Sequence, residues 1–396
     1  MRRKLKILAI IIAIIGLGVF VYLYFFASKA TITVTPGGGL PIAGQGVPAV
    51  TDSATSAVGE PVPVTARLVK VSVGPVVQGE AVTDVIVASS SPVAVVKYIE
   101  RQSGNVYSYN VGTGAITRTN NQTVPGIQSA AWLPDASMAF VRYLSGDTFS
   151  TINTYALPAS SDSKQSGFFL SQNLSDIAVS SSSVLSLASG VNGSAASLGN
   201  IKDARTVSLF TSPLSALHLS FAGKSQYLGY TKPSAALAGF AYIIDSTGTF
   251  SRISGPKNGL VALASPSGKW ALVSYVENGN MQLQLVETAT GNTTALPIAT
   301  IADKCVWAAD DSSVYCGVPM EPPAGYAYPD DWYQGAVPFN DRIWKIEVVG
   351  RYAQLVLDFS KETDESLDAV ALAIDPLNTM LVFVNKNDDS LWAYKL

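Results

Sequence analysis

The residues best suited to bind a ligand are concentrated in one segment near the C-terminus, between Cys316 and Arg342. Large aromatic side chains provide contact area for recognition, and carboxylates beside them accept hydrogen bonds from sugars or peptides and attract cations. Prolines in the same segment reduce the entropy that is lost when a loop becomes ordered. The alternative interpretation is a self-packed lid, whose rings only cover the fold beneath it. The predicted recognition site consists of Tyr326, Tyr328, Asp330, Asp331, Trp332, Tyr333 and Phe339.

The two cysteines of the chain have a spacing that favours a disulfide. Cys305 and Cys316 are equally distant from the pair Asp310-Asp311. A hairpin that turns at this pair places the two cysteines directly opposite each other, where their Cβ atoms come within disulfide range. We therefore predict a Cys305–Cys316 bridge, as is common outside the cytoplasm. Two buried free thiols are the alternative.

Residue patterns of known catalytic sites are missing from the sequence. It contains no Gly-x-Ser-x-Gly, no P-loop and no His-Glu-x-x-His. The single histidine, His218, lies in an apolar segment that is expected to be an inner strand, which favours a structural role. A zinc site needs several histidine or cysteine ligands. We therefore assign no catalytic residue, no metal and no cofactor, and we do not expect an enzyme.

A repeated unit of about 44 residues has to position these side chains. Each copy has an anchor, the end of a short apolar strand followed by a turn. A Thr-Gly pair recurs at a constant distance after several anchors, and its glycine supplies the positive φ that a tight hairpin requires. The anchors begin at Ala88, Trp132, Ala178, Phe221, Ala264, Ala308 and Ala373, and the pairs at Thr113, Thr247 and Thr290. Such a period is typical of a β-propeller with one blade per repeat.

The anchors predict an all-β fold, a seven-bladed β-propeller of four-stranded antiparallel blades. The last repeat supplies only three strands: Asp368–Ile374, Met380–Val384 and Leu391–Leu396. A missing fourth strand would leave an unpaired sheet edge beside the first blade. We therefore expect the alternating segment Arg67–Val73 to be the closing strand of the last blade. A six-bladed ring with an accessory hairpin is the alternative.

Two repeats resemble a known family. Trp132–Phe140 reads Trp-Leu-Pro-Asp-Ala-Ser-Met-Ala-Phe, and Ala264–Leu272 reads Ala-Ser-Pro-Ser-Gly-Lys-Trp-Ala-Leu. Both are similar to the repeat of TolB-type propellers, distant relatives of WD-repeat proteins, although Leu133 and Ala136 depart from the usual Ser and Gly. The resemblance covers roughly residues 65–396. It implies an extracytoplasmic binding platform and carries over no catalytic residue.

The N-terminus predicts a membrane anchor. Ile7–Phe26 is a run of twenty uncharged residues, about 30 Å long as a helix and enough to cross a bilayer. Four basic residues precede it, so residues 1–30 are expected to form a cytoplasmic stub and a transmembrane signal anchor, with the remaining chain extracytoplasmic. A signal peptide cleaved after Ala30 is the alternative. The Pro- and Gly-rich stretch 31–66 is expected to be a linker, and 67–396 the propeller.

The charge balance narrows the choice of partner. The chain has 26 basic and 29 acidic residues and a net charge of −3. This balance argues against nucleic acid as the partner, because proteins bind nucleic acid through basic surfaces. We therefore predict a membrane-anchored extracytoplasmic scaffold of the bacterial cell envelope that binds a protein or glycan. An envelope enzyme, either a hydrolase or a quinone-dependent dehydrogenase using the propeller channel, is one alternative, and a structural spacer is another.

Overall fold

The computed structural model describes residues 60–86, 91–163, 165–201 and 205–396. They belong to the second of two units, Thr55–Leu396, and the account below concerns this unit alone. The predicted membrane span Ile7–Phe26 and the predicted linker up to residue 59 lie outside the described residues. Within those ranges, no helix is both long enough and apolar enough to cross a membrane.

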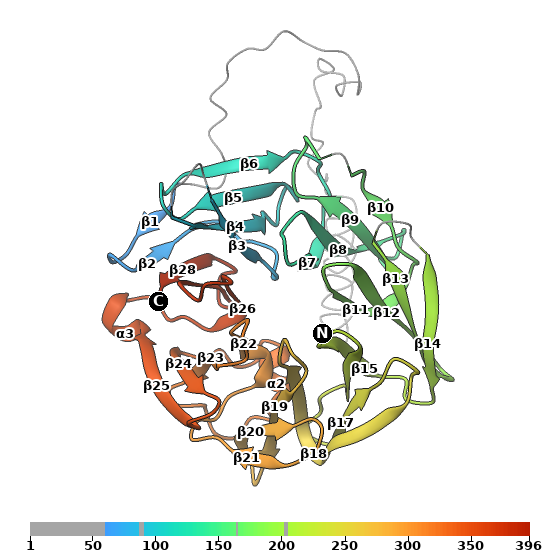
Figure 1. Ribbon diagram of the computed structural model, residues 1–396. Coiled ribbons are helices and arrows are strands. Elements are labelled where there is room, and N and C mark those ends of the chain that lie inside the picture. Colours follow the sequence, from blue (N-terminus) through green and yellow to red (C-terminus); the bar gives the residue numbers. More distant parts are fainter. Residues whose placement is uncertain (1–59, 87–90, 164, 202–204) are drawn as a thin grey trace, which may run out of the picture. The chain divides into compact units, whose positions relative to one another are not determined.

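The described part of the chain is built from antiparallel strands in six sheets (Figure 1). Four sheets have four strands each: β3 (Ala81–Val85), β4 (Val93–Ile99), β5 (Val106–Asn110) and β6 (Ile116–Asn120); β7 (Ile127–Trp132), β8 (Met138–Ser145), β9 (Thr151–Pro158) and β10 (Phe168–Phe169); β11 (Leu174–Val179), β12 (Ser183–Gly190), β13 (Gly193–Asn200) and β14 (Thr206–Ser212); β22 (Cys305–Trp307), β23 (Ser313–Pro319), β24 (Asp341–Glu347) and β25 (Tyr352–Asp358).

The two remaining sheets are larger. One has seven strands: β15 (Leu217–Ala222), β16 (Gln226–Thr231), β17 (Ala238–Ile244), β18 (Phe250–Ala264), β19 (Trp270–Glu277), β20 (Asn280–Glu287) and β21 (Thr293–Ala295). The other has five: β26 (Ala369–Ile374), β27 (Met380–Asn385), β28 (Leu391–Lys395), β2 (Leu68–Lys70) and β1 (Val62–Pro63). Three short helices connect strands: the 3-10 helix η1 (Ala302–Lys304), α2 (Asp330–Tyr333) and α3 (Phe359–Glu362).

The sheets are arranged around a common centre, and the strands on the inside are β3, β7, β11, β15, β22 and β26, among others (Figure 1). Inner strands of neighbouring sheets contact one another, as β7 does with β11 and β22 with β26. Strands β23 and β27, second in their sheets, are buried along their whole length because neighbouring sheets pack on both of their faces. This radial arrangement of antiparallel sheets is that of a β-propeller.

The prediction of seven separate four-stranded blades is met only in part. The all-β class and the four-stranded antiparallel sheets are present, but β18 is a single 15-residue strand. Its first half pairs with β17 and its last residues pair with β19. Two groups of strands are therefore fused into one sheet, because the chain continues as a strand where the sequence repeat predicts a loop.

The two ends of the propeller pair with each other. Leu68 lies opposite Tyr394, and Lys70 lies opposite Trp392, so the pairing predicted between Arg67–Val73 and Leu391–Leu396 is present over Leu68–Lys70. Nε of Arg67 also donates to the carbonyl oxygen of Lys395 at 2.8 Å. One detail differs from the prediction, since Val62–Pro63, within the expected linker 31–66, adds β1 to the outer edge of β2.

Cys305 and Cys316 lie opposite each other on β22 and β23. Their Cα atoms are 4.1 Å apart, and the two sulfur atoms form a disulfide. The hairpin between these strands turns at Asp310-Asp311, where the symmetric spacing places it. The bridge fixes the register of β22, a strand of only three residues.

We expect Leu68→Ala to destabilise the propeller because Leu68 is fully buried in the contact between the chain ends. Truncating a buried leucine costs about 2–5 kcal/mol of unfolding free energy. Denaturant unfolding followed by tryptophan fluorescence measures the change. Val62→Ala on β1 is the control, since Val62 is 48% exposed and its truncation should cost less than about 0.5 kcal/mol. Equal midpoints for both variants would show that the end pairing contributes little.

Candidate functional site

The insertion Pro319–Phe339 joins β23 to β24 and contains α2. Its predicted recognition residues differ in their exposure. Tyr328, Trp332 and Phe339 are buried, whereas Tyr326 and Tyr333 are each 41% exposed. The burial of Trp332 is what the lid alternative expects of this residue, and recognition by the insertion stays a prediction.

The two acidic residues of the predicted site hold the insertion in place. The carboxylate of Asp330 accepts a hydrogen bond from the backbone N–H of Ala235 at 2.8 Å, which ties α2 to the loop after β16. The carboxylate of Asp331 accepts one from Ala327 at 2.7 Å, within the insertion. Gly259 of β18 lies beneath, where an added Cβ would come within 3.0 Å of the carbonyl oxygen of Tyr328. The insertion is thus packed tightly on the neighbouring sheet.

A buried group of charges lies under the insertion. The ammonium group of Lys304, which is fully buried, pairs with Asp368 and lies 2.8 Å from the carboxylate of Asp341. Asp368 also accepts hydrogen bonds from the indole N–H of Trp332 at 2.9 Å and from the backbone N–H of Phe339 at 3.1 Å. We call Lys304, Asp341 and Asp368 the buried ionic network.

The electrostatics of this network follow from its burial. Removal from water raises the pKa of Asp341 to about 6, and the ammonium group of Lys304 opposes that rise. The same ammonium lies 4.9 Å from the centre of the Trp332 ring, a favourable cation–π distance. Trp332 therefore joins the insertion to the network through both its ring face and its N–H group.

A second group of polar side chains gathers at the centre of the ring. Asp176 lies on β11 and His218 on β15, each near the beginning of an inner strand. Asp303 lies in η1, directly before the inner strand β22, and Tyr333 is the last residue of α2. Tyr230 of β16 completes the group. We call these five residues the central polar cluster.

Contacts within the central polar cluster are close. Nδ1 of His218 lies 3.5 Å from the carboxylate of Asp176, long for a hydrogen bond, so their attraction is mainly electrostatic. The backbone N–H of Leu219 donates to the same oxygen at 2.8 Å and holds it in place. The His218 ring stacks on that of Tyr230 with centroids 5.1 Å apart. The hydroxyl of Tyr333 donates to Asp303.

The charges of the cluster influence one another. Burial disfavours the imidazolium, but Asp176 and Asp303 together outweigh that cost and raise the pKa of His218 above 6.5, against a small opposing effect of Lys232. Desolvation raises the pKa of Asp303, although Tyr333 and His218 counteract it. Asp303 and Tyr333 nevertheless keep more than a third of their surface accessible, and the His218 side chain keeps 43%. These accessible groups can exchange protons and hydrogen bonds with a ligand.

Sequence reasoning missed this cluster, since it treated His218 as a structural residue and gave Asp176 and Asp303 no role. A usable signal was present. Each of the three precedes a repeat anchor by a few residues: Asp176 before Ala178, His218 before Phe221 and Asp303 before Ala308. The inner strands that end at the anchors surround the centre of a propeller, so polar residues shortly before several anchors can meet there.

A metal centre is not indicated in the part of the chain that the structure describes. No three histidine, cysteine, aspartate or glutamate side chains there are grouped so as to hold an ion. The central polar cluster itself offers carboxylates, an imidazole and phenols.

Comparison with known proteins gives the fold and no closer relationship. No protein family matches the chain, and no curated protein sequence matches it. Among solved structures, oligogalacturonate lyase from Vibrio parahaemolyticus has a TM-score of 0.53 at 10% identity, over 81% of this chain and 98% of that one. The β-propeller domain of the Trilobed protease from Pyrococcus furiosus has a TM-score of 0.52 at 8% identity, over 81% and 95%. At these identities the likeness supports the β-propeller fold alone.

We expect Trp332→Ala to lower stability, because it opens a cavity beneath the insertion and removes a donor from the buried carboxylate of Asp368. Truncation of a buried aromatic residue costs about 3–5 kcal/mol. Tyr326→Ala, which truncates an exposed ring of the same insertion, should cost much less. Denaturant unfolding of both variants is the measurement, and an unchanged midpoint for Trp332→Ala would contradict the packing role.

We expect His218 to titrate above 6.5, and its position as the single histidine makes its NMR resonance directly assignable. Asp176→Asn should lower the pKa of His218, because the carboxylate that offsets much of the cost of burying the imidazolium would be lost. A raised pKa means that protonation stabilises the fold, a contribution present below pH 6.5 and lost as pH rises through the folded-state pKa. Asp310→Asn, at the remote hairpin turn, should leave the titration unchanged. A wild-type pKa at or below 6.5 would refute the proposed pairing.

Proposed function

We propose that this chain is a ligand-binding propeller and that the central polar cluster takes the ligand. The observation that carries the proposal is the convergence of accessible acid, imidazole and phenol groups from separate strands and from the insertion. Binding sites are commonly made in this way, from a few fixed polar groups on a rigid scaffold. A purely structural spacer would have no need of these groups.

The charges of the cluster indicate the ligand class. Asp176 and Asp303 supply two carboxylates against the single imidazolium of His218, so hydroxyl and ammonium donors are favoured over anions. The accessible ring of Tyr333 offers a surface on which a sugar ring can stack. We therefore propose a glycan with neutral or amino-bearing sugars, which is one of the two partner classes, protein or glycan, expected from the sequence.

An enzyme is the second candidate, favoured by the pairing of His218 with Asp176. A carboxylate that orients an imidazole is a recurring arrangement in general acid–base catalysis. The similarity to an oligogalacturonate lyase is compatible with an enzyme, but it does not identify a reaction. That enzyme acts, by its name, on a polyanion, which the acidic excess of the present cluster disfavours.

We further propose that the propeller acts in the cell envelope, tethered by Ile7–Phe26 with the cluster on the extracytoplasmic side. The twenty-residue apolar run and the basic residues before it support the tether. Protease accessibility of the propeller in intact cells tests this topology.

We count the seven-stranded sheet as two blades that share β18, which gives seven blades.

The function can be tested with three pentasaccharides of different charge. We expect N-acetylated chitopentaose or its deacetylated form to bind the full chain more tightly than pentagalacturonate, as measured by calorimetry. Asp303→Asn should weaken binding at least tenfold, and Asp310→Asn should leave it unchanged. Failure of all three sugars to bind at millimolar concentration, or a preference for the uronate, would contradict the proposal. Cleaved products in mass spectra would support the enzyme instead.

A further inference from the structure

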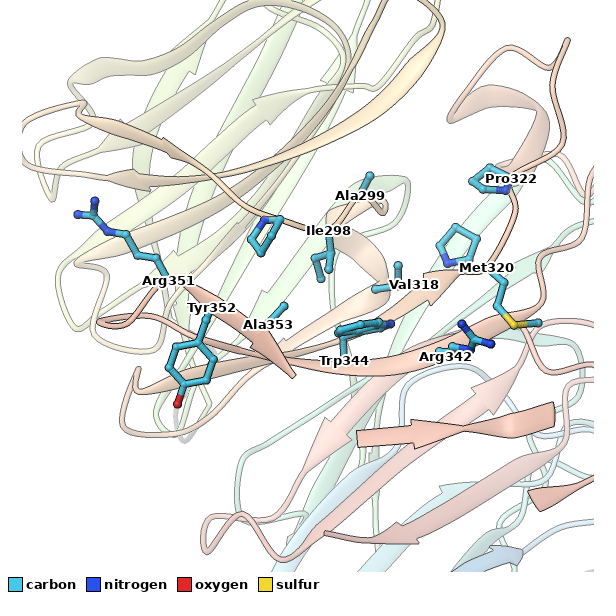
Figure 2. A pocket seen from close by; sticks show the side chains of 12 residues that line it. Ile298, Ala299, Val318, Met320, Pro322, Arg342, Trp344, Arg351, Tyr352 and Ala353 are labelled. Carbon is cyan, nitrogen blue, oxygen red and sulfur yellow. The ribbon is translucent and has the colours of Figure 1, made fainter. Parts of the chain in front are cut away.

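One hollow of the described structure shares no lining residue with the central polar cluster. It is a groove of about 700 Å³ between the segment after β21 and the strands β23, β24 and β25 (Figure 2). The start of the insertion closes one end of it. Its walls consist of Pro297, Ile298, Ala299, Val318, Pro319, Met320, Pro322, Arg342, Trp344, Arg351, Tyr352 and Ala353.

The walls of the groove are mostly apolar, and a positively charged side chain lies at each end. Aliphatic side chains and prolines surround Trp344, which lies between Arg342 and Arg351 at opposite ends of the groove in Figure 2. No acidic residue lines it, although the chain as a whole is acidic. The groove is therefore complementary to an apolar ligand that carries a negative charge.

The two arginines differ in availability. Arg342 lies 3.1 Å from the carboxylate of Asp358, which neutralises part of its charge. Arg351 is exposed, and within the described ranges it forms no ion pair. The unneutralised charge is therefore concentrated at the Arg351 end, in the turn that leads into β25.

The dimensions of the groove fit an extended chain. Arg342 is near the beginning of β24, and Arg351 follows its end, so the groove runs along the part of β24 from Arg342 to Glu347, about 17 Å at 3.3 Å per residue. This length matches about five residues of extended peptide. A second hollow of about 420 Å³, at Asn278–Met281 and Pro322–Gly325, shares Ala299 and Pro322 with the groove. The two hollows therefore adjoin at these two residues.

We propose that this groove binds an extended peptide segment of a partner protein, with apolar side chains over Trp344 and a carboxylate toward Arg351. A saccharide is disfavoured because, apart from the two arginines, only Trp344 and Tyr352 can form side-chain hydrogen bonds in the groove. Sugars need several such groups, whereas apolar peptide side chains need contact area. This groove is separate from the proposed glycan site, so a result that contradicts one proposal leaves the other unaffected.

The test uses synthetic acetylated heptapeptides in three classes, each randomised over apolar residues with one acidic, one basic or no charged position. Fluorescence polarisation with the full chain should show binding mainly in the acidic class. Trp344→Ala should weaken binding at least tenfold. Arg351→Glu should weaken it at least tenfold and shift the preference to the basic class, an exchange that misfolding cannot produce.

Two controls separate this site from others. Arg118→Glu changes an exposed arginine on β6 and should leave peptide binding unchanged, as should His218→Ala in the central polar cluster. The proposal is overturned if no class binds, if Arg351→Glu and Arg118→Glu have equal effects, or if pentagalacturonate competes with the acidic peptides for Arg351.

Discussion

The burial of one ammonium group constrains the whole C-terminal part of the propeller. Lys304 cannot reach water, and a buried charge is tolerated only when it is paired and hydrogen-bonded. Its partners, Asp341 and Asp368, come from the beginning of β24 and from the residue before β26. The backbone N–H of Ala369 donates to Asp341 at 2.7 Å, which links the two acidic partners. The network therefore fixes three segments of the chain at a single point, and removing either carboxylate would leave an unbalanced buried charge.

The same constraint positions the candidate site. In η1, Lys304 enters the network while the preceding residue, Asp303, enters the central polar cluster. In α2, Trp332 donates to the network while the following residue, Tyr333, donates to Asp303. Two pairs of consecutive residues thus connect the buried charges to the accessible ones. The geometry of the cluster depends on an interaction that no ligand can touch.

Period and symmetry made much of the fold predictable. Because each repeat has its own apolar strand and turn, the anchors locate inner strands such as β7, and the equal spacing about Asp310-Asp311 aligns Cys305 with Cys316. Burial within the insertion was not predictable in this way. An aromatic, proline-rich loop has the same composition whether Trp332 faces a partner or covers Asp368, and that choice depends on a lysine and an aspartate distant in sequence. The cluster was missed for a related reason, since Asp176, His218 and Asp303 come from different repeats and meet only when the ring closes.

The insertion takes part in both proposed sites, which raises the question of whether they communicate. Pro319, Met320 and Pro322 at its start line the groove, and its later residues, Trp332 and Tyr333, contact the network and the cluster. Coupling between two ligands requires that each binds two arrangements of the connecting segment with different affinity. Here the connecting segment is held by hydrogen bonds to Asp368 and Ala235 and by close packing on Gly259. A second arrangement would uncover the buried charge of Lys304 and remove the hydrogen bonds that Trp332 and Phe339 donate to Asp368, at a cost that a small ligand cannot readily supply. The structure therefore favours two sites that bind independently at different parts of the insertion.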